Sequence, residues 1–219
     1  MTRTRRILTW TAGVLGVATV AMAALHTPIG MRLLRGGGGG TCPFGMDGAA
    51  LAPAVRDEHR RIAVERLRGD VLVSARPAGD FTLGATTRAE VRTWAAAQGS
   101  ECRPGRDQRG LQCDAAGDAR ASFYLDFDQR DVLVGAMWMT YSRKAEDASA
   151  RLAAARAALQ GAVGAPTRDV GEVDAAYLAA RPLRQARSEY RRANYYAALS
   201  ATNMGPSGYL VSQVYQSMD

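Results

Sequence analysis

The stretch from Ala121 to Tyr141 constrains the fold of this chain more than any other part of its sequence. It reads as two β-strands joined by the polar turn Asp128–Asp131. Apolar and polar side chains alternate along the first strand, which is typical of a strand with one buried face. The second strand is apolar on both faces, which favours a central position in a sheet. The stretch therefore predicts a hairpin onto which the rest of the domain packs.

The second strand of this hairpin leaves two interpretations open. The domain's own helices could cover both of its faces, and we favour this interpretation. Alternatively, one face rich in Met and aromatic groups binds a partner, since such side chains adapt to many surfaces. The residues that we name for this possible binding surface are Met137, Trp138, Met139, Tyr195 and Tyr196.

Helices and strands follow one another in a repeated order after residue 86. Thr87 and Glu90 have the spacing of a capping box, which predicts a short helix that ends at Gly99. Residues 167–190 are polar and rich in Arg, and we interpret them as a loop with a short helix. The other elements that we expect are a second helix at residues 146–161 and two strands at residues 192–201 and 209–217.

The order helix, hairpin, helix, hairpin is a tandem α-β-β arrangement. We predict an α+β domain with a single antiparallel sheet of four to five strands and two helices packed on one face. An N-terminal transmembrane helix is expected to precede it.

That helix is expected from Ile7 to Leu25, nineteen residues without a charge that follow three arginines. As a helix the segment would span about 28 Å, close to the thickness of the hydrocarbon core of a bilayer. The basic flank predicts a single-pass inner-membrane protein whose C-terminal domain is periplasmic. Cleavage after Ala21-Met22-Ala23, which would release the protein to the periplasm, is the alternative.

The chain divides into four predicted regions. Residues 1–30 are the signal anchor, and residues 31–49 are a tether that includes five consecutive glycines. Residues 50–79 have the apolar period of an amphipathic helix followed by a linker, and residues 80–219 form the exported domain. Cys42 lies on the tether, and its role stays open.

Charge argues against nucleic-acid binding despite the net charge of +7. Residues 1–79 carry 11 basic and 5 acidic side chains, whereas residues 80–219 carry 17 and 16. A phosphate-binding surface needs basic residues clustered on the folded domain. We therefore expect another exported or membrane protein as the partner, and no nucleic acid.

Cys102 and Cys113 bracket a polar, turn-rich loop. In an exported protein, two cysteines at this spacing most simply form a disulfide. Neither a further Cys nor a His lies near enough in sequence to complete a zinc site.

Asp126, Asp128 and Asp131 are the one carboxylate cluster that invites chemistry. They could bind Ca²⁺, although the loop lacks the glycine and the distal Glu of an EF-hand. Asp126 and Asp128 could also serve a hydrolase as paired carboxylates, but no histidine, nucleophile motif or phosphate loop accompanies them. We interpret the three as solvated carboxylates at a turn, and predict no catalytic residue, no metal and no cofactor.

The segment Leu83–Val91 resembles the opening of the first helix in the SmpA/OmlA family of outer-membrane-assembly modules. Gly164-Ala165-Pro166 is similar to the ending of their helical pair. The tandem arrangement also resembles the β-lactamase-inhibitor-protein fold. The family's lipidated cysteine is absent, and the apolar segment stands in its place. The resemblance implies a non-catalytic envelope module that binds other proteins.

The sequence therefore predicts an envelope-anchored, non-catalytic protein-binding or scaffold module. The alternative is a periplasmic domain that holds a small apolar ligand on its sheet, with Trp138 and the C-terminal tyrosines.

Overall fold

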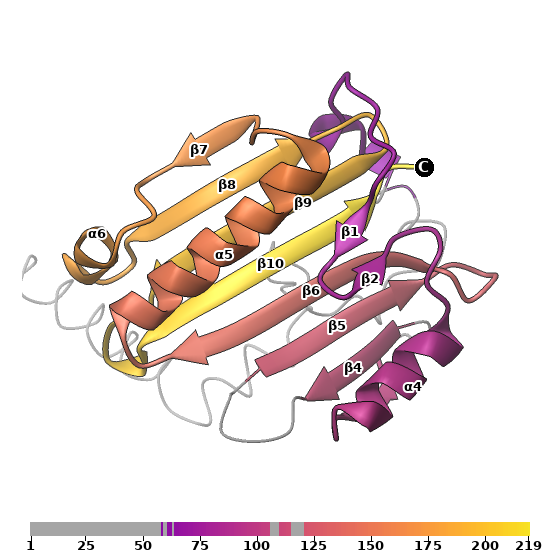
Figure 1. Ribbon diagram of the computed structural model, residues 1–219, viewed down its shortest axis with the longest axis horizontal. Helices are drawn as coiled ribbons and strands as arrows, with labels where there is room; N and C mark the ends of the chain where they lie inside the picture. Colours follow the sequence, from indigo (N-terminus) through magenta and orange to yellow (C-terminus); the bar gives the residue numbers. More distant parts are fainter. Residues whose placement is uncertain (1–57, 59–60, 63, 106–109, 115–120) are drawn as a thin grey trace, which may run out of the picture. The chain divides into compact units, whose positions relative to one another are not determined.

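The computed structural model describes residues 58, 61–62, 64–105, 110–114 and 121–219. All of them belong to the unit Ala49–Asp219, and most build one antiparallel sheet of eight strands (Figure 1). The strands are β3 (Glu101–Pro104), β4 (Gly110–Asp114), β5 (Ala121–Phe127), β6 (Leu133–Ser142), β7 (Arg168–Val170), β8 (Gln185–Arg191), β9 (Tyr195–Asn203) and β10 (Tyr209–Ser217).

Two halves of similar construction meet in the middle of this sheet. The helix α4 (Arg88–Ala97) precedes β3 to β6, and the helix α5 (Ala145–Val163) precedes β7 to β10. The strand order is β3-β4-β5-β6-β10-β9-β8-β7, so each half runs inward from a sheet edge and the last strands of the halves pair. β10 pairs with β6 from Tyr209 opposite Ser142 to Gln216 opposite Gly135, which joins the halves along nearly the full length of both strands.

Smaller elements complete the domain. A short helix α6 (Ala175–Ala179) lies between β7 and β8, and a 3₁₀ turn η1 (Gly205–Ser207) connects β9 to β10. Before α4, β1 (Pro77–Ala78) and β2 (Phe81–Thr82) form a two-stranded hairpin of their own.

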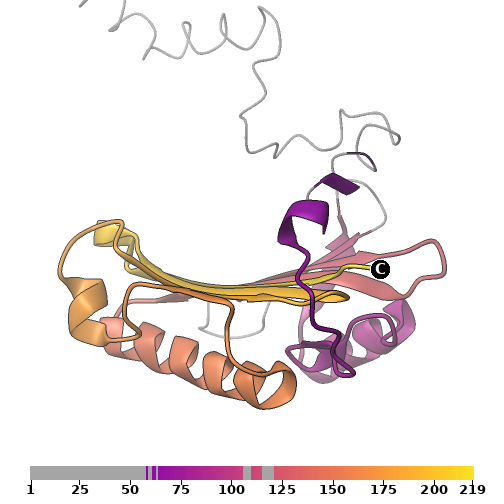
Figure 2. The same cartoon turned by 90° about the horizontal axis from the view of Figure 1, so that it is seen from above.

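Both long helices lie on the same face of the sheet, as the edge-on view shows (Figure 2). The capping box at the start of α4 is confirmed: Glu90 N donates to Thr87 Oγ1, and Thr87 N donates to the Glu90 carboxylate. Val91 and Ala95 of this helix face the core. Trp94 packs edge-on against an aromatic cluster that comprises Phe81, Phe123 and Trp138.

The other face of the sheet carries a smaller apolar cluster over β9 and β10. Val64 and Leu67, at the end of a helix before the sheet, pack against Tyr196, Ala198 and Met218. The charged side chains of β8 lie on this face as well, where Glu189 is buried between Arg187 and Arg191 at 2.9 Å from each.

The predicted fold class is wrong. The structure is mostly β, with eight strands in the large sheet and a second sheet of two, where four to five strands in a single sheet were expected. The sequence predicts a polar loop around the cysteines where β3 and β4 lie, and an Arg-rich loop where β7 and β8 lie. Their outward faces are polar, and polar side chains on short strands hide the alternation that identifies a strand.

The predicted single-pass inner-membrane localisation is also corrected. No helix in the part of the chain that the structure describes is long and apolar enough to cross a membrane. α5 is the longest of the helices Figure 1 labels, and it carries four charged side chains among its 19 residues. The segment predicted to span, Ile7 to Leu25, lies outside the described residues, as do the tether and Cys42.

The predicted disulfide is confirmed. Cys102 on β3 and Cys113 on β4 face each other in the register of the two strands and are bonded. The bond closes the outermost hairpin of the sheet, where β3 has only one neighbouring strand.

Candidate functional site

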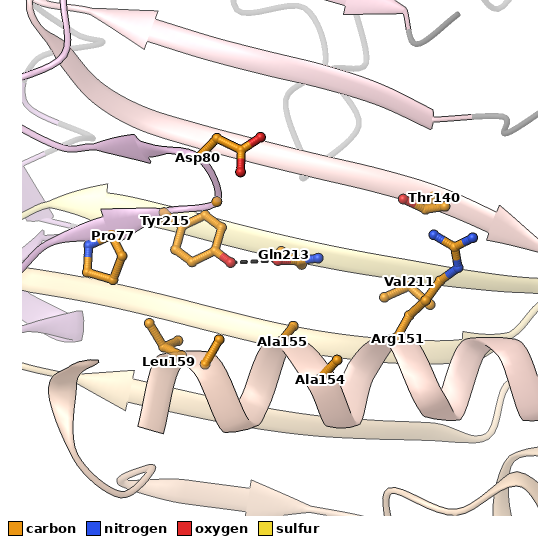
Figure 3. A pocket seen from close by; sticks show the side chains of 12 residues that line it. Pro77, Asp80, Thr140, Arg151, Ala154, Ala155, Leu159, Val211, Gln213 and Tyr215 are labelled. Carbon is orange, nitrogen blue, oxygen red and sulfur yellow. Dashed lines mark hydrogen bonds between the residues drawn. The ribbon is translucent and has the colours of Figure 1, made fainter. Parts of the chain in front are cut away.

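A cleft of about 430 Å³ lies where the two halves of the domain meet. Its floor comes from the paired strands β6 and β10, and its banks are α5 on one side and the β1–β2 turn on the other (Figure 3). This volume is within the range of pockets that hold small organic ligands, and such pockets favour the boundaries between structural units.

Small side chains on α5 leave the cleft open. The helix presents Ala154, Ala155 and Ala158 to it, with Leu159 at one end. Leu152 is fully buried and anchors the same helix to the sheet. Alanines therefore line this bank without reaching the opposite one, while the leucines hold the helix in place.

The opposite bank is fixed by close packing of the β1–β2 turn. Gly79 has a φ of +63°, and a Cβ there would lie 2.7 Å from Trp138 Cζ2. Tyr195 Oη donates to the backbone oxygen of Pro77 at 2.6 Å. Glycine is required at residue 79 because the backbone is left-handed and rests on the indole ring.

The floor carries polar groups within an apolar setting. Gln213 and Tyr215 project from β10 into the cleft, and Tyr215 Oη points toward Gln213 and donates to its Oε1 at 2.6 Å (Figure 3). Burial raises the pKa of the Tyr215 hydroxyl well above its ordinary value, so it stays a neutral donor at physiological pH. Val211 and Thr140 face each other across β10 and β6 and complete the floor.

Two opposite charges stand at the rim. Asp80 belongs to the β1–β2 turn, and Arg151 extends from α5 toward Thr140 (Figure 3). Both residues are exposed. Within the described residues, neither makes an ion pair or a side-chain hydrogen bond. The cleft thus offers an apolar wall, a neutral polar floor and one charge of each sign.

The five residues predicted as a binding surface do not lie together. Met137 and Met139 are half-buried on the face opposite the helices, whereas Trp138 lies on the helix face beneath Gly79. Tyr195 is fully buried under the β1–β2 hairpin, and Tyr196 is buried on the opposite face beside Met218. Whether either set binds a partner stays a prediction.

The three aspartates of the predicted carboxylate cluster have separate surroundings. Asp128 accepts hydrogen bonds from the backbone of Arg130 and Val132, and Asp131 pairs with Arg88 at 2.8 Å. Asp126 lies opposite Gly135 on the face away from the helices. Among the described residues, no group of three or more His, Cys, Asp or Glu is placed to hold a metal ion.

Sequence reasoning missed the residues that define the cleft. Asp80 and Arg151 are far apart along the chain and carry no motif. Only the alanine-rich composition of α5 gave a signal, since three small residues near one face of a helix leave space beside it. Trp138 and Tyr195, which were named, support the turn that forms one bank.

No protein-family model matches the chain, and no curated protein matches it. Among solved structures, the chain is similar to the crystal structure of a DUF4309 family protein (YjgB) from Bacillus subtilis. The sequence identity is 14%, the TM-score is 0.34, and the match covers 72% of this chain and 92% of the other.

Proposed function

We propose that this domain is a non-catalytic binding module that takes a small amphiphilic ligand in the cleft between α5 and the β1–β2 turn. The observation that carries the proposal is the cleft itself, about 430 Å³ with a mainly apolar wall and a few convergent polar groups. Ligand sites in proteins have this composition, because apolar area supplies affinity and the few polar groups fix orientation.

The surrounding residues favour binding over catalysis. The polar groups on the floor are the hydroxyl of Thr140 and an amide and a neutral phenol that are hydrogen-bonded to each other. A general base needs a pKa near the working pH, and the raised pKa of the Tyr215 hydroxyl moves it further from that range. The proposed role is therefore to hold a molecule and to leave its bonds unchanged.

Two neighbouring alanines of α5 allow a matched test. Ala158 lines the cleft, whereas Ala157 is exposed outside it. Leucine has nearly the helix propensity of alanine, so both Ala158→Leu and Ala157→Leu should preserve the fold. A fragment library would be screened against the full chain by ligand-observed NMR. We expect fragments that bind the parent protein and Ala157→Leu but are lost from Ala158→Leu. A screen in which no hit distinguishes the two variants would refute the proposal.

The protein-binding role expected from the sequence remains a second proposal. One observation favours it: Met137 lies between Tyr124 of β5 and Val214 of β10 on the face opposite the helices, and all three are only half-buried. The flexible side chain of methionine adapts to the shapes of protein partners. Met137→Glu should reduce recovery of a crosslinked partner. Leu183→Glu, at a side chain that is 76% exposed elsewhere, serves as the control. If Met137→Glu and Leu183→Glu recover the same amount of crosslinked partner, this role is refuted.

A further inference from the structure

The charges at the rim of the cleft identify a class of ligand. Asp80 and Arg151 stand on opposite banks, one on the β1–β2 turn and the other on α5, and the alanines of α5 line the cleft beside them. Charged groups beside an apolar cleft focus the local field and orient ligands that carry the opposite charge. A molecule lying along this cleft meets a carboxylate on one side and a guanidinium on the other.

In the described part of the chain, neither Asp80 nor Arg151 forms an ion pair or a side-chain hydrogen bond with another residue. By contrast, Arg156, on the next turn of α5, pairs with Asp169 at 2.7 Å, and Arg76, just before β1, pairs with Asp219. Arg151 extends toward Thr140 in Figure 3, and both residues line the cleft. Arg151 is thus placed to receive a carboxylate, and Asp80 an ammonium group.

We propose that the cleft selects zwitterions: molecules with a carboxylate at one end, an ammonium at the other, and a short hydrocarbon between them. The carboxylate faces Arg151, the ammonium faces Asp80, and the hydrocarbon lies on the alanines of α5. This inference rests on the proposed small-ligand function and specifies its ligand.

Three compounds of matched length separate the contributions of the two charges. ε-Aminocaproate carries both charges, caproate carries only the carboxylate, and hexylamine carries only the ammonium. Each would be titrated into the ¹⁵N-labelled full chain, with amide shifts of the β1–β2 turn and α5 as the readout. Exposed ion pairs contribute up to about 1 kcal/mol each, so ε-aminocaproate should bind about fivefold more tightly than either singly charged compound. A series from γ-aminobutyrate to ω-aminocaprylate should show one best length.

Reversal of the rim charges tests the assignment of each end. Asp80→Arg should shift the preference to caproate, and Arg151→Asp should shift it to hexylamine. The double variant restores one charge of each sign and should bind ε-aminocaproate again, in the reversed orientation. Because both residues are exposed, none of these variants removes core packing. Arg143→Glu, at an exposed arginine outside the cleft lining, is the control and should leave the preference unchanged.

The outcomes separate this inference from the proposed function. Tighter binding of ε-aminocaproate, with rescue in the double variant, supports it. The zwitterion inference is overturned if caproate or hexylamine binds as tightly as ε-aminocaproate or more tightly. It is also overturned if none of the three compounds binds. In either case the comparison of Ala158→Leu with Ala157→Leu still decides whether the cleft binds small molecules at all.

Discussion

At the scale of single residues, Arg192 is a buried charge that contacts the end of α5. Its side chain is only 8% exposed, yet it has no carboxylate partner among the described residues. Its guanidinium instead donates to the backbone oxygens of Val163 at 3.0 Å and Ala165 at 2.6 Å, just where α5 ends. The last carbonyl groups of a helix lack intrahelical partners and carry partial negative charge, so a cation there stabilises the helix end.

Arg192→Met should therefore lower the free energy of unfolding by about 1–3 kcal/mol, since it leaves the carbonyl oxygens of Val163 and Ala165 without these donors. Arg192→Lys should lie in between, because an ammonium keeps the charge but lacks the planar fork that reaches both oxygens. Urea unfolding followed by circular dichroism measures both. Arg168→Met, at an exposed arginine of β7, is the control and should change stability by less than about 0.5 kcal/mol. The capping role would be contradicted if Arg192→Met lowered the free energy of unfolding by no more than the control does.

At the scale of elements, the β5–β6 turn depends on one carboxylate. Asp128 Oδ1 accepts hydrogen bonds from the backbone N–H groups of Val132 at 2.9 Å and Arg130 at 2.8 Å. These bonds, first that from Val132, hold the pKa of the Asp128 carboxyl below its ordinary value. A carboxyl with a lowered pKa in the folded state contributes stability above its unfolded pKa of about 3.9 and loses it as the pH falls through the folded value.

Asp128→Asn should flatten the acid side of the stability profile. The amide oxygen still accepts a hydrogen bond, but the side chain no longer titrates. Denaturant unfolding at a series of pH values from about 5 to about 2 should show a smaller loss of stability in the variant than in the parent protein. Asp70→Asn, at an exposed aspartate, is the control and should keep the parent profile. If the free energy of unfolding falls equally with pH in the parent protein and in Asp128→Asn, the Asp128 carboxylate does not contribute to the acid dependence of stability.

The elements that sequence reasoning found are those with local signals. The capping box of Thr87 and Glu90 sets the start of α4 within a few residues, and the cysteines bond because their spacing suits a hairpin. β8 was missed because Arg187, Glu189 and Arg191 read as a solvated loop. In the fold Glu189 pairs with both arginines on the sheet, and no local sequence pattern shows this pairing. The cleft was missed for a related reason. It lies between α5 and the β1–β2 turn, which are distant in sequence, and it stays open because the side chains of α5 there are alanines.

At the scale of the whole molecule, the pairing of β6 with β10 makes the two halves one sheet. The contact runs from Ser142 to Gly135 and is as continuous as the pairing within either half. Fusion along a full strand should make unfolding cooperative, because separating the halves would expose two long unpaired edges. We therefore expect both halves to unfold in one transition, although each has its own helix.

The tryptophans allow this cooperativity to be measured. Trp94 and Trp138 both belong to the half that contains α4, so in a Trp10→Phe background their fluorescence reports that half alone. Leu152→Ala removes a fully buried side chain from α5, in the other half, and should cost about 2–5 kcal/mol. Fluorescence and far-ultraviolet circular dichroism should then shift to the same lower denaturant midpoint. Leu183→Ala, at an exposed leucine, should leave both midpoints in place. The contrary result is an unchanged fluorescence midpoint together with a circular dichroism transition that splits in two. It would mean that the halves unfold separately. The cleft at their junction could then open without unfolding of either half.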